Sequence, residues 1–288
     1  DITTKAIQDY IDERANPQSN NIKPLAMSGL KRIIQFIRPC MKKAVEEGII
    51  YNNPCDYVIL PSESCITVET KTQYSLTDSE IQKLKSSALS KYKTTDEYYS
   101  RDFFILLLII NLGLRVGEVL ALEWTDIDFN NKTIHINKTV QSNIANFNYE
   151  HGNNTTYNRI KKSTKTKSGV RVLQLNENVI WYLSELKAYD ERHNINSKYI
   201  ACTNVGTMNS SRNLQRSLDR LARKAGISKK ITLHTLRHTF GSTLLRKGVN
   251  IEVVSKLMGH ANIMITYNKY IHTIQEEEAK AMNMIKVC

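Results

Sequence analysis

Apolar residues recur at helical spacing along most of the chain. Ile7, Tyr10 and Ile11 follow an i, i+3, i+4 pattern, and a longer apolar series over residues 30–45 continues that spacing for about four turns. The first part of the chain is therefore expected to consist of short helices that bury one apolar face each.

A second helical region is expected after a polar interruption. Residues 62–75 are polar and lack periodicity, which predicts a linker. Thr77 and Glu80 then form a capping-box pattern, a typical start of a helix. The run 103–122 is apolar on nearly every face, so it predicts a buried helix with a break near Gly113.

Short strands are expected among these helices. Residues 133–136 and 170–173 are rich in β-branched side chains, and the polar, Asn-rich stretch 141–160 between them is expected to be mobile. Further helical patterns follow over three segments: 176–190, 211–225 and 250–259. The fold class is therefore mainly α with a small antiparallel β-sheet, an α+β arrangement.

Three parts follow from these patterns. We expect a small helical domain over residues 1–66, a linker over 67–75 and a larger domain over 76–288. The longest apolar run, 103–110, has eight residues, whereas a membrane span needs about 20. The sequence therefore predicts no transmembrane helix.

Composition and charge narrow the functional classes. The 288 residues are 41% hydrophobic and 24% charged, which excludes a disordered, collagen-like or disulfide-dense chain. Five cysteines without a CxxC pair favour a reducing compartment, so we expect a cytoplasmic protein. The net charge of +12 favours a polyanionic partner, with nucleic acid before an anionic membrane surface; a basic protein without such a partner is the alternative.

Arg115 is the first candidate for chemistry, because it follows the most apolar segment of the chain. A guanidinium buried without a partner is very costly. It could pair with Glu118 three residues later on the same helix. Alternatively, it could bind an external phosphate through two parallel hydrogen bonds.

His234 and Arg237 are the second candidates, three residues apart on one helix face. An arginine beside an imidazole suits the two non-bridging oxygens of a phosphodiester. An exposed basic helix start is the simpler alternative. His234 and His238 also have the i, i+4 spacing of zinc ligands, but the glutamate of an HExxH motif is missing.

The remaining candidates lie near the C-terminus. His260 follows Gly259, and the segment TYNKYIH over 266–272 contains Tyr267 and Tyr270. A tyrosine is ordinarily a core or interface residue, but it can also act as a covalent nucleophile. Because a phenol has a pKa of about 10, attack on phosphorus would need neighbouring cations or a base.

The order of these motifs resembles that of the tyrosine recombinases. The stretch HTLRHTFGSTLLRKGVNIEVVSKLMGHANIMITYNKYIH (234–272) matches in order and spacing, and GLRVGEVLALEWTDIDF (113–129) resembles the first arginine box. STKTKSGVRVLQL (163–175) is similar to the hairpin that carries the family's lysine. AVEEGIIYNNPC (44–55) resembles the end of the core-binding domain in the phage- and transposon-integrase branch.

The resemblance implies a site for phosphoryl transfer without metal, ATP or other cofactor. Arg115 and Arg237 would hold the non-bridging oxygens of the scissile phosphate. His234 and His260 would donate hydrogen bonds to the same group or assist proton movement.

The nucleophile and the acid are implied in the same way. Tyr270 would attack to form a 3′-phosphotyrosyl link, with Tyr267 as the weaker candidate. Lys165 would protonate the leaving 5′-oxygen, with Lys167 as the alternative in the same hairpin.

The resemblance also implies partners. The two domains would enclose duplex DNA, four protomers would form the synaptic complex, and an accessory excision factor is a further expected partner. The tail 273–288 would pack either on a neighbouring protomer or on its own domain. DNA contacts are expected from basic residues of both domains: Lys23, Lys31, Arg32, Lys42, Lys43, Lys161, Lys162, Lys167, Arg212 and Arg216.

We expect an integrase of a phage or integrative transposon that acts at the bacterial nucleoid. The alternatives are a chromosome-dimer-resolving recombinase of the Xer type, a type IB topoisomerase-like enzyme and a DNA-binding protein without catalysis. The chain begins at Asp1 without the N-terminal arm-binding domain of many integrases, so we expect that domain to be either absent or removed.

Overall fold

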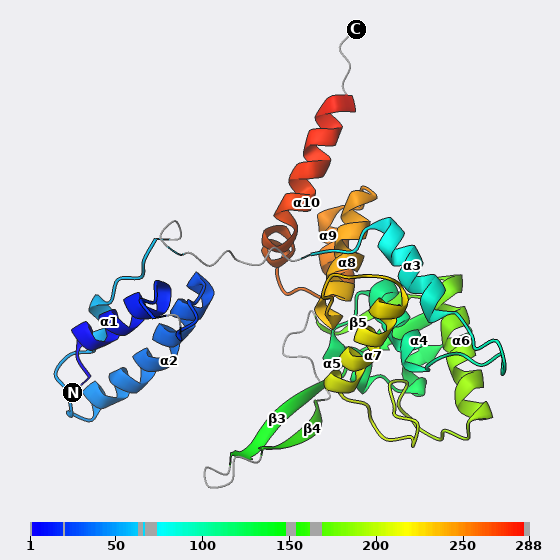
Figure 1. Cartoon of the computed structure of the whole chain (residues 1–288), viewed down its shortest axis with the longest axis horizontal. Coiled ribbons are helices and arrows are strands. Elements are labelled where there is room, and N and C mark those ends of the chain that lie inside the picture. Colours follow the sequence, from blue (N-terminus) through cyan, green and yellow to red (C-terminus); the bar gives the residue numbers. More distant parts are fainter. Residues whose placement is uncertain are drawn as a thin grey trace. The chain divides into compact units, whose positions relative to one another are not determined.

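The computed structural model describes residues 2–19, 21–62, 66, 74–147, 154–161 and 169–284. The chain divides into two compact units, residues 1–72 and residues 73–288. Figure 1 shows the elements of the two units. Each unit has hydrophobic core residues of its own.

The first unit is a small helical bundle. It contains α1 (Thr4–Ala15), α2 (Met27–Glu46) and a short 3₁₀ helix (Pro54–Tyr57). The expected helical spacing is present, but Tyr10 is 46% exposed and does not belong to the buried face. Its expected burial is wrong because the face of α1 that packs inward is narrow, with only Ile7, Ile11 and Ala15 buried.

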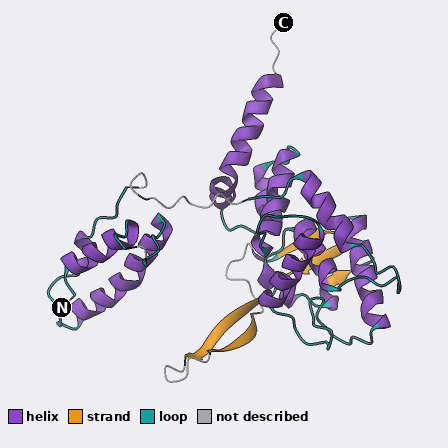
Figure 2. Ribbon diagram, viewed as in Figure 1, coloured by secondary structure: helices purple, strands orange, loops and turns teal. Residues whose placement is uncertain are grey.

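The second unit is mostly helical, with few strands (Figure 2). Its helices are α3 (Asp78–Ala88), α4 (Asp102–Leu112), α5 (Val116–Ala121), α6 (Glu177–Arg192), α7 (Ser211–Lys224), α8 (Leu233–Arg246), α9 (Ile251–Met258) and α10 (Ile263–Met284), with a 3₁₀ turn at Trp124–Asp126. The predicted fold class is confirmed, and the predicted capping box opens α3, where Thr77 Oγ1 accepts from the amide of Glu80 and the Glu80 carboxylate accepts from the amide of Thr77.

A three-stranded antiparallel sheet packs against the helices. Its strands are β1 (Ile127–Asp128), β2 (Thr133–Ile136) and β5 (Arg171–Gln174), in the order β1-β2-β5. Ile134 is opposite Leu173, and both are buried, whereas Val172 points outward. The strand prediction is confirmed, with β5 displaced by one residue.

The described parts of the Asn-rich stretch, 141–147 and 154–160, form strands, and the expected mobility of the stretch stays a prediction. Strands β3 (Thr139–Phe147) and β4 (Asn154–Lys161) form a separate antiparallel hairpin, which extends from the second unit in Figure 1. Cross-strand pairing outweighs the low strand propensity of asparagine, because pairs such as Val140–Ile160 and Ile144–Thr156 place β-branched residues opposite one another.

Helix α4 forms the centre of the second core. Every side chain from Phe103 to Ile110 is buried, and α4 packs against α6, α7 and α8. Just before the helix, Arg101 is 1% exposed; it binds both carboxylate oxygens of Asp190 at 2.7 Å and donates to the carbonyls of Cys202 and Ile200. This buried pair anchors α4 to α6, far along the chain.

Two left-handed glycines then position the segments that carry the candidate chemistry. Gly113 ends α4 with φ +62°, and the turn that follows delivers Arg115 to the start of α5. Gly259 ends α9 with φ +65°, and Asn250 caps the start of that helix, as predicted. In the described residues, no helix is both long and apolar enough to cross a membrane.

We expect Gly113→Ala to destabilise the second unit more than Gly226→Ala. Both glycines have positive φ, so each alanine costs about 1–2 kcal/mol in backbone strain. A Cβ on Gly113 would lie 2.3 Å from the Phe240 ring, whereas a Cβ on Gly226 meets nothing within 4 Å. The contact should cost Gly113→Ala a further ~1–3 kcal/mol in free energy of unfolding, measured by urea denaturation; equal costs would contradict this packing.

Candidate active site

Three arginines bind the C-terminus of α9 through hydrogen bonds to its carbonyls. The last carbonyls of a helix lack partners within the helix and carry the negative end of its dipole. Here three successive carbonyls each accept from a different guanidinium. Leu257 O accepts from Arg171 Nε at 2.8 Å, Met258 O from Arg237 at 2.6 Å and Gly259 O from Arg115 at 2.7 Å.

Glu118 lies between the same three arginines and is 1% exposed. Its carboxylate accepts from the Arg115 amide at 2.9 Å, from the Arg115 guanidinium at 2.7 Å and from two nitrogens of Arg171 at 2.9 and 3.1 Å. Burial alone would raise the pKa of Glu118, but the hydrogen bonds and charges of Arg171 and Arg115 lower it. Glu118 is therefore ionised. We call Arg115, Arg171 and Arg237, together with Glu118, the arginine cluster.

Arg237 is the buried member of the pair expected to hold phosphate. Its guanidinium donates to the carbonyl of Gly113 at 2.5 Å and to that of Met258, and it lies 4.0 Å from Glu118. Burial, with a contribution from Arg115, lowers its pKa to about 9, so the group stays charged at neutral pH.

Arg115 is the accessible member of that pair. The pairing with Glu118 expected from the i+3 spacing is confirmed. The Arg115 side chain is nevertheless 38% exposed, so an anion could reach it from the solvent. Arg115 can therefore pair with Glu118 and still bind an external phosphate, which were the two alternatives left open by the sequence.

Two histidines flank the cluster in their neutral form. His260 Nδ1 lies 2.7 Å from Thr266 Oγ1. Desolvation, with the charges of Arg237 and Arg115, lowers the pKa of His260 to about 4. His234 lies in the first turn of α8, where desolvation and then the nearby Lys269 lower its pKa. At neutral pH each ring keeps one N–H donor.

His238 does not form a zinc face with His234. It is buried, its Nδ1 lies 3.0 Å from Ser242 Oγ, and its ring meets that of Tyr270 edge-on at 4.6 Å. Desolvation lowers the pKa of His238 to about 4. The described residues contain no group of three His, Cys, Asp or Glu side chains that could hold a metal ion.

Tyr270 is buried beside the cluster. It is 1% exposed, and its hydroxyl donates to Met258 Sδ at 3.4 Å. It also interrupts α10, with φ −118° and ψ 16°. Desolvation raises the pKa of this phenol above its ordinary value, although Arg237 opposes the shift. Tyr267, the weaker candidate, is exposed.

A glycine makes room for the buried phenol. A Cβ on Gly241 of α8 would lie 2.4 Å from Tyr270 Oη and 2.9 Å from Met258 Sδ. Only a residue without a side chain therefore allows Tyr270 to occupy this position unchanged.

Sequence reasoning did not select two residues of this region. Arg171 lies within the predicted strand 170–173, and its signal was a charged residue in an otherwise apolar strand. Lys269 directly precedes Tyr270; desolvation, followed by the charges of Arg237 and Arg115, lowers its pKa. Lys269 is therefore a further titratable group close to the arginine cluster.

The remaining expected site and contact residues fall into two groups. Lys162, Lys165 and Lys167 are outside the described residues, as is the side chain of Lys161 at the end of β4. The five expected cations of the first unit are all exposed: Lys23, Lys31, Arg32, Lys42 and Lys43. Lys42 and Lys43 each lie within 4.0 Å of Glu46, a surface pairing worth little.

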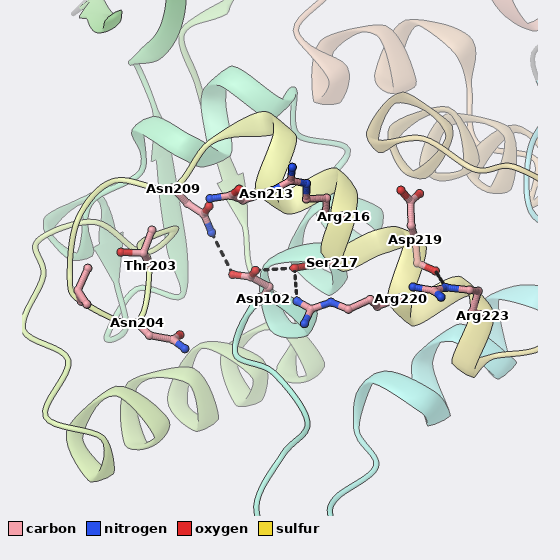
Figure 3. A pocket seen from close by; sticks show the side chains of 11 residues that line it. Asp102, Thr203, Asn204, Asn209, Asn213, Arg216, Ser217, Asp219, Arg220 and Arg223 are labelled. Atoms are coloured by element: carbon pink, nitrogen blue, oxygen red, sulfur yellow. Dashed lines mark hydrogen bonds between the residues drawn. The ribbon is translucent and has the colours of Figure 1, made fainter. Parts of the chain in front are cut away.

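A basic pocket of about 690 Å³ lies along α7, and no residue of the arginine cluster lines it. Figure 3 shows Arg216, Arg220 and Arg223 on its helical side and Asp102 at its base. Asp102 accepts from Asn209 and Ser217. Arg212 and Arg216 are exposed on α7, and neither forms an ion pair with any residue in the described ranges.

Comparisons with known proteins identify the family of the chain. Residues 75–277 match the phage integrase family. The chain is 30% identical over 268 residues to a XerC-like tyrosine recombinase of Caldanaerobacter subterraneus subsp. tengcongensis, covering 89% of this chain and 65% of that protein. It is 25% identical to the integrase of Staphylococcus phage L54a (96% and 77% covered) and 26% identical to the transposase of transposon Tn916 from Enterococcus faecalis (84% and 58%).

The chain thus spans less than two thirds of the XerC-like protein and of the Tn916 transposase. In fold, it matches the Tn1549 transposon integrase in complex with transposon right-end DNA, with a TM-score of 0.73 and 19% identity over 99% of this chain and 85% of that chain. Because the family match covers most of the chain, the resemblance found in its motifs is confirmed, and the chain belongs to the phage integrase family of tyrosine recombinases.

Proposed function

We propose that the protein is a site-specific DNA recombinase, the integrase or transposase of a mobile element. It cuts and rejoins DNA strands through a 3′-phosphotyrosyl intermediate. The observation that carries this proposal is the convergence of Arg115, Arg237 and His260 at the end of α9, with Arg115 partly open to solvent. The phage integrase and the Tn916 transposase among its relatives support the mobile-element assignment.

The arginine cluster would stabilise the transition state by charge. Negative charge grows on the non-bridging oxygens as phosphorus becomes five-coordinate, and preorganised cations stabilise it without reorganising. Arg115 and Arg237 are held by backbone carbonyls and Glu118, so little rotamer entropy would be lost when DNA binds. Neutral His234 and His260 would donate hydrogen bonds to the same oxygens.

The covalent step exchanges one phosphoester for another. Tyr270 Oη bonds to phosphorus, the bond from phosphorus to the 5′-oxygen breaks, and the phenol proton passes to a nearby base. Lys165 supplies the proton that the leaving 5′-oxygen takes up. Attack by a 5′-hydroxyl of another strand reverses the step, so no bond energy is lost.

Tyr270 must leave its buried position before it can react. A phenol that is 1% exposed cannot contact a phosphate of duplex DNA. The interruption of α10 at Tyr270 gives the chain a point at which to turn the side chain outward. DNA binding would therefore accompany release of the phenol from Met258 and His238.

The partners we propose are duplex DNA and further copies of the chain. Exposed Arg212 and Arg216 of α7, with the basic side chains of the first unit, would contact phosphates, as would Lys161, Lys162 and Lys167. Four protomers would form the synaptic complex at the bacterial nucleoid, and an accessory excision factor would set direction. The small helical unit would serve as the core-binding domain.

A recombinase that resolves chromosome dimers is the second candidate, favoured by the XerC-like relative. The substrates separate the two: a mobile-element integrase acts on the ends and circular junction of its element, whereas a resolvase acts on a chromosomal site. Cleavage of only the chromosomal site would support the second candidate.

Tyr270→Phe should abolish covalent cleavage and leave DNA binding intact. The change removes only the hydroxyl, whose one contact is the weak bond to Met258. A nicked half-site from an element end, incubated with protein in EDTA and resolved on a denaturing gel, reports the adduct. Tyr267→Phe, which alters an exposed ring, is the matched control and should keep it. An adduct that survives Tyr270→Phe would assign the nucleophile elsewhere.

Gly241→Ala should speed adduct formation by about tenfold, equal to a ~1.4 kcal/mol shift toward the released tyrosine. The added methyl would overlap the phenol in its buried position. Gly29→Ala in α2 is the control, because its Cβ would come no nearer than 3.3 Å to Leu25. An unchanged or lower rate at equal DNA affinity would argue against release of Tyr270 as a requirement.

Replacing both Arg212 and Arg216 with glutamine should weaken DNA binding and its salt dependence. Each lost phosphate contact lowers the log–log salt slope by about 0.9, so the slope should fall by about 2. The matched control is Lys132→Gln with Lys198→Gln, which removes two charges already paired with glutamates. Equal slopes for the two double variants would exclude the α7 face as a DNA contact.

A further inference from the structure

The guanidinium of Arg171 makes its hydrogen bonds inside the protein, and the side chain is buried. Its side chain is 7% exposed. Its Nε donates to Leu257 O at 2.8 Å, and its two terminal nitrogens donate to the two oxygens of Glu118 at 3.1 and 2.9 Å. A third acceptor, Gly169 O, lies at 3.3 Å. With these donors occupied, Arg171 is not a direct phosphate contact.

Its contacts join three elements of the second unit. Arg171 itself belongs to β5, Glu118 to α5 and Leu257 to α9. The start of α5 carries Arg115, and the end of α9 holds both Arg115 and Arg237 through its carbonyls. A displacement of Arg171 would therefore move the supports of both phosphate-binding arginines.

Arg171 also uses part of the hydrogen-bonding capacity of the Glu118 carboxylate, which Arg115 and Arg237 could otherwise use. Arg115 lies 2.7 Å and Arg237 lies 4.0 Å from the Glu118 carboxylate. An oxygen lone pair of this carboxylate without a donor would attract either guanidinium. Because Arg171 occupies both oxygens, Arg237 stays on the carbonyls of Gly113 and Met258.

We propose that Arg171 is a positioning residue for strand cleavage: by binding Glu118 and the end of α9, it keeps Arg115 and Arg237 available to the scissile phosphate. This rests on the proposed function, since it concerns the same cleavage step. A purely structural ion pair would behave differently. Arg101, equally buried and bound to both oxygens of Asp190, touches no residue of the arginine cluster and is the matched comparison.

The test uses two substrates that differ only in charge at the scissile phosphate. In a methylphosphonate, a methyl group replaces one non-bridging oxygen, so the reacting centre is neutral and needs less cationic stabilisation. Adduct formation is followed on both substrates for the full chain, Arg171→Gln, Arg171→Lys and Arg101→Lys, with Arg115→Ala as the reference for a lost phosphate contact. DNA affinity is measured in parallel.

Arg171→Gln should cleave the phosphodiester about 10- to 100-fold more slowly than the unaltered chain, the scale of a misplaced catalytic group. On the methylphosphonate the loss should be several-fold smaller, as for Arg115→Ala, with unchanged DNA affinity. Arg171→Lys keeps the charge but cannot span both Glu118 oxygens and Leu257 O, so it should show an intermediate loss with the same dependence on substrate.

A merely structural role gives another pattern. Arg101→Lys lowers the folded fraction and should lose the same factor on both substrates. The proposal is overturned if the two Arg171 variants lose cleavage rate by the same factor on both substrates, whatever their folded fraction. It is also overturned if neither variant loses any cleavage rate. Failure of the proposed function is seen elsewhere, as the absence of any Tyr270-dependent adduct with the unaltered chain.

Discussion

The unpaired carbonyl end of α9 is the feature on which the candidate site depends. A helix terminus leaves carbonyls that need donors, and here three guanidinium groups supply them in consecutive order. Left-handed Gly259 ends the helix at this point and turns the chain toward His260. The arrangement satisfies the backbone and at the same time assembles a concentrated positive charge, with Glu118 as its close counterion among the described residues.

Met258 contacts both Arg237 of the arginine cluster and Tyr270, the candidate nucleophile. Its carbonyl accepts from Arg237, while its sulfur accepts from the hydroxyl of Tyr270. The phenol is thereby held in an apolar cluster with Leu245 and Val254, next to the arginine cluster. Burial raises the pKa of the phenol and hides it from water, so the candidate nucleophile is withdrawn from solvent while Arg115 is partly exposed.

Much of the fold was predictable because its signals are local. Capping residues, the apolar run of α4 and left-handed glycines at 113 and 259 each act within a few residues of themselves. The hairpin of β3 and β4 was not predictable in the same way, since its strands gain stability from each other rather than from their asparagine-rich composition. The exposure of Tyr10 likewise depends on how little of α1 is covered.

The sequence by itself determined the chemical types at the site and their order: Arg115, His234, Arg237, His260 and Tyr270 were all selected from motif spacing. The tertiary structure alone decided which groups hold them. Arg171 meets Leu257 across 86 positions, and Arg115 meets Gly259 across 144. No periodicity encodes such pairs, because backbone carbonyls are the same in every residue and only packing determines which of them a guanidinium reaches.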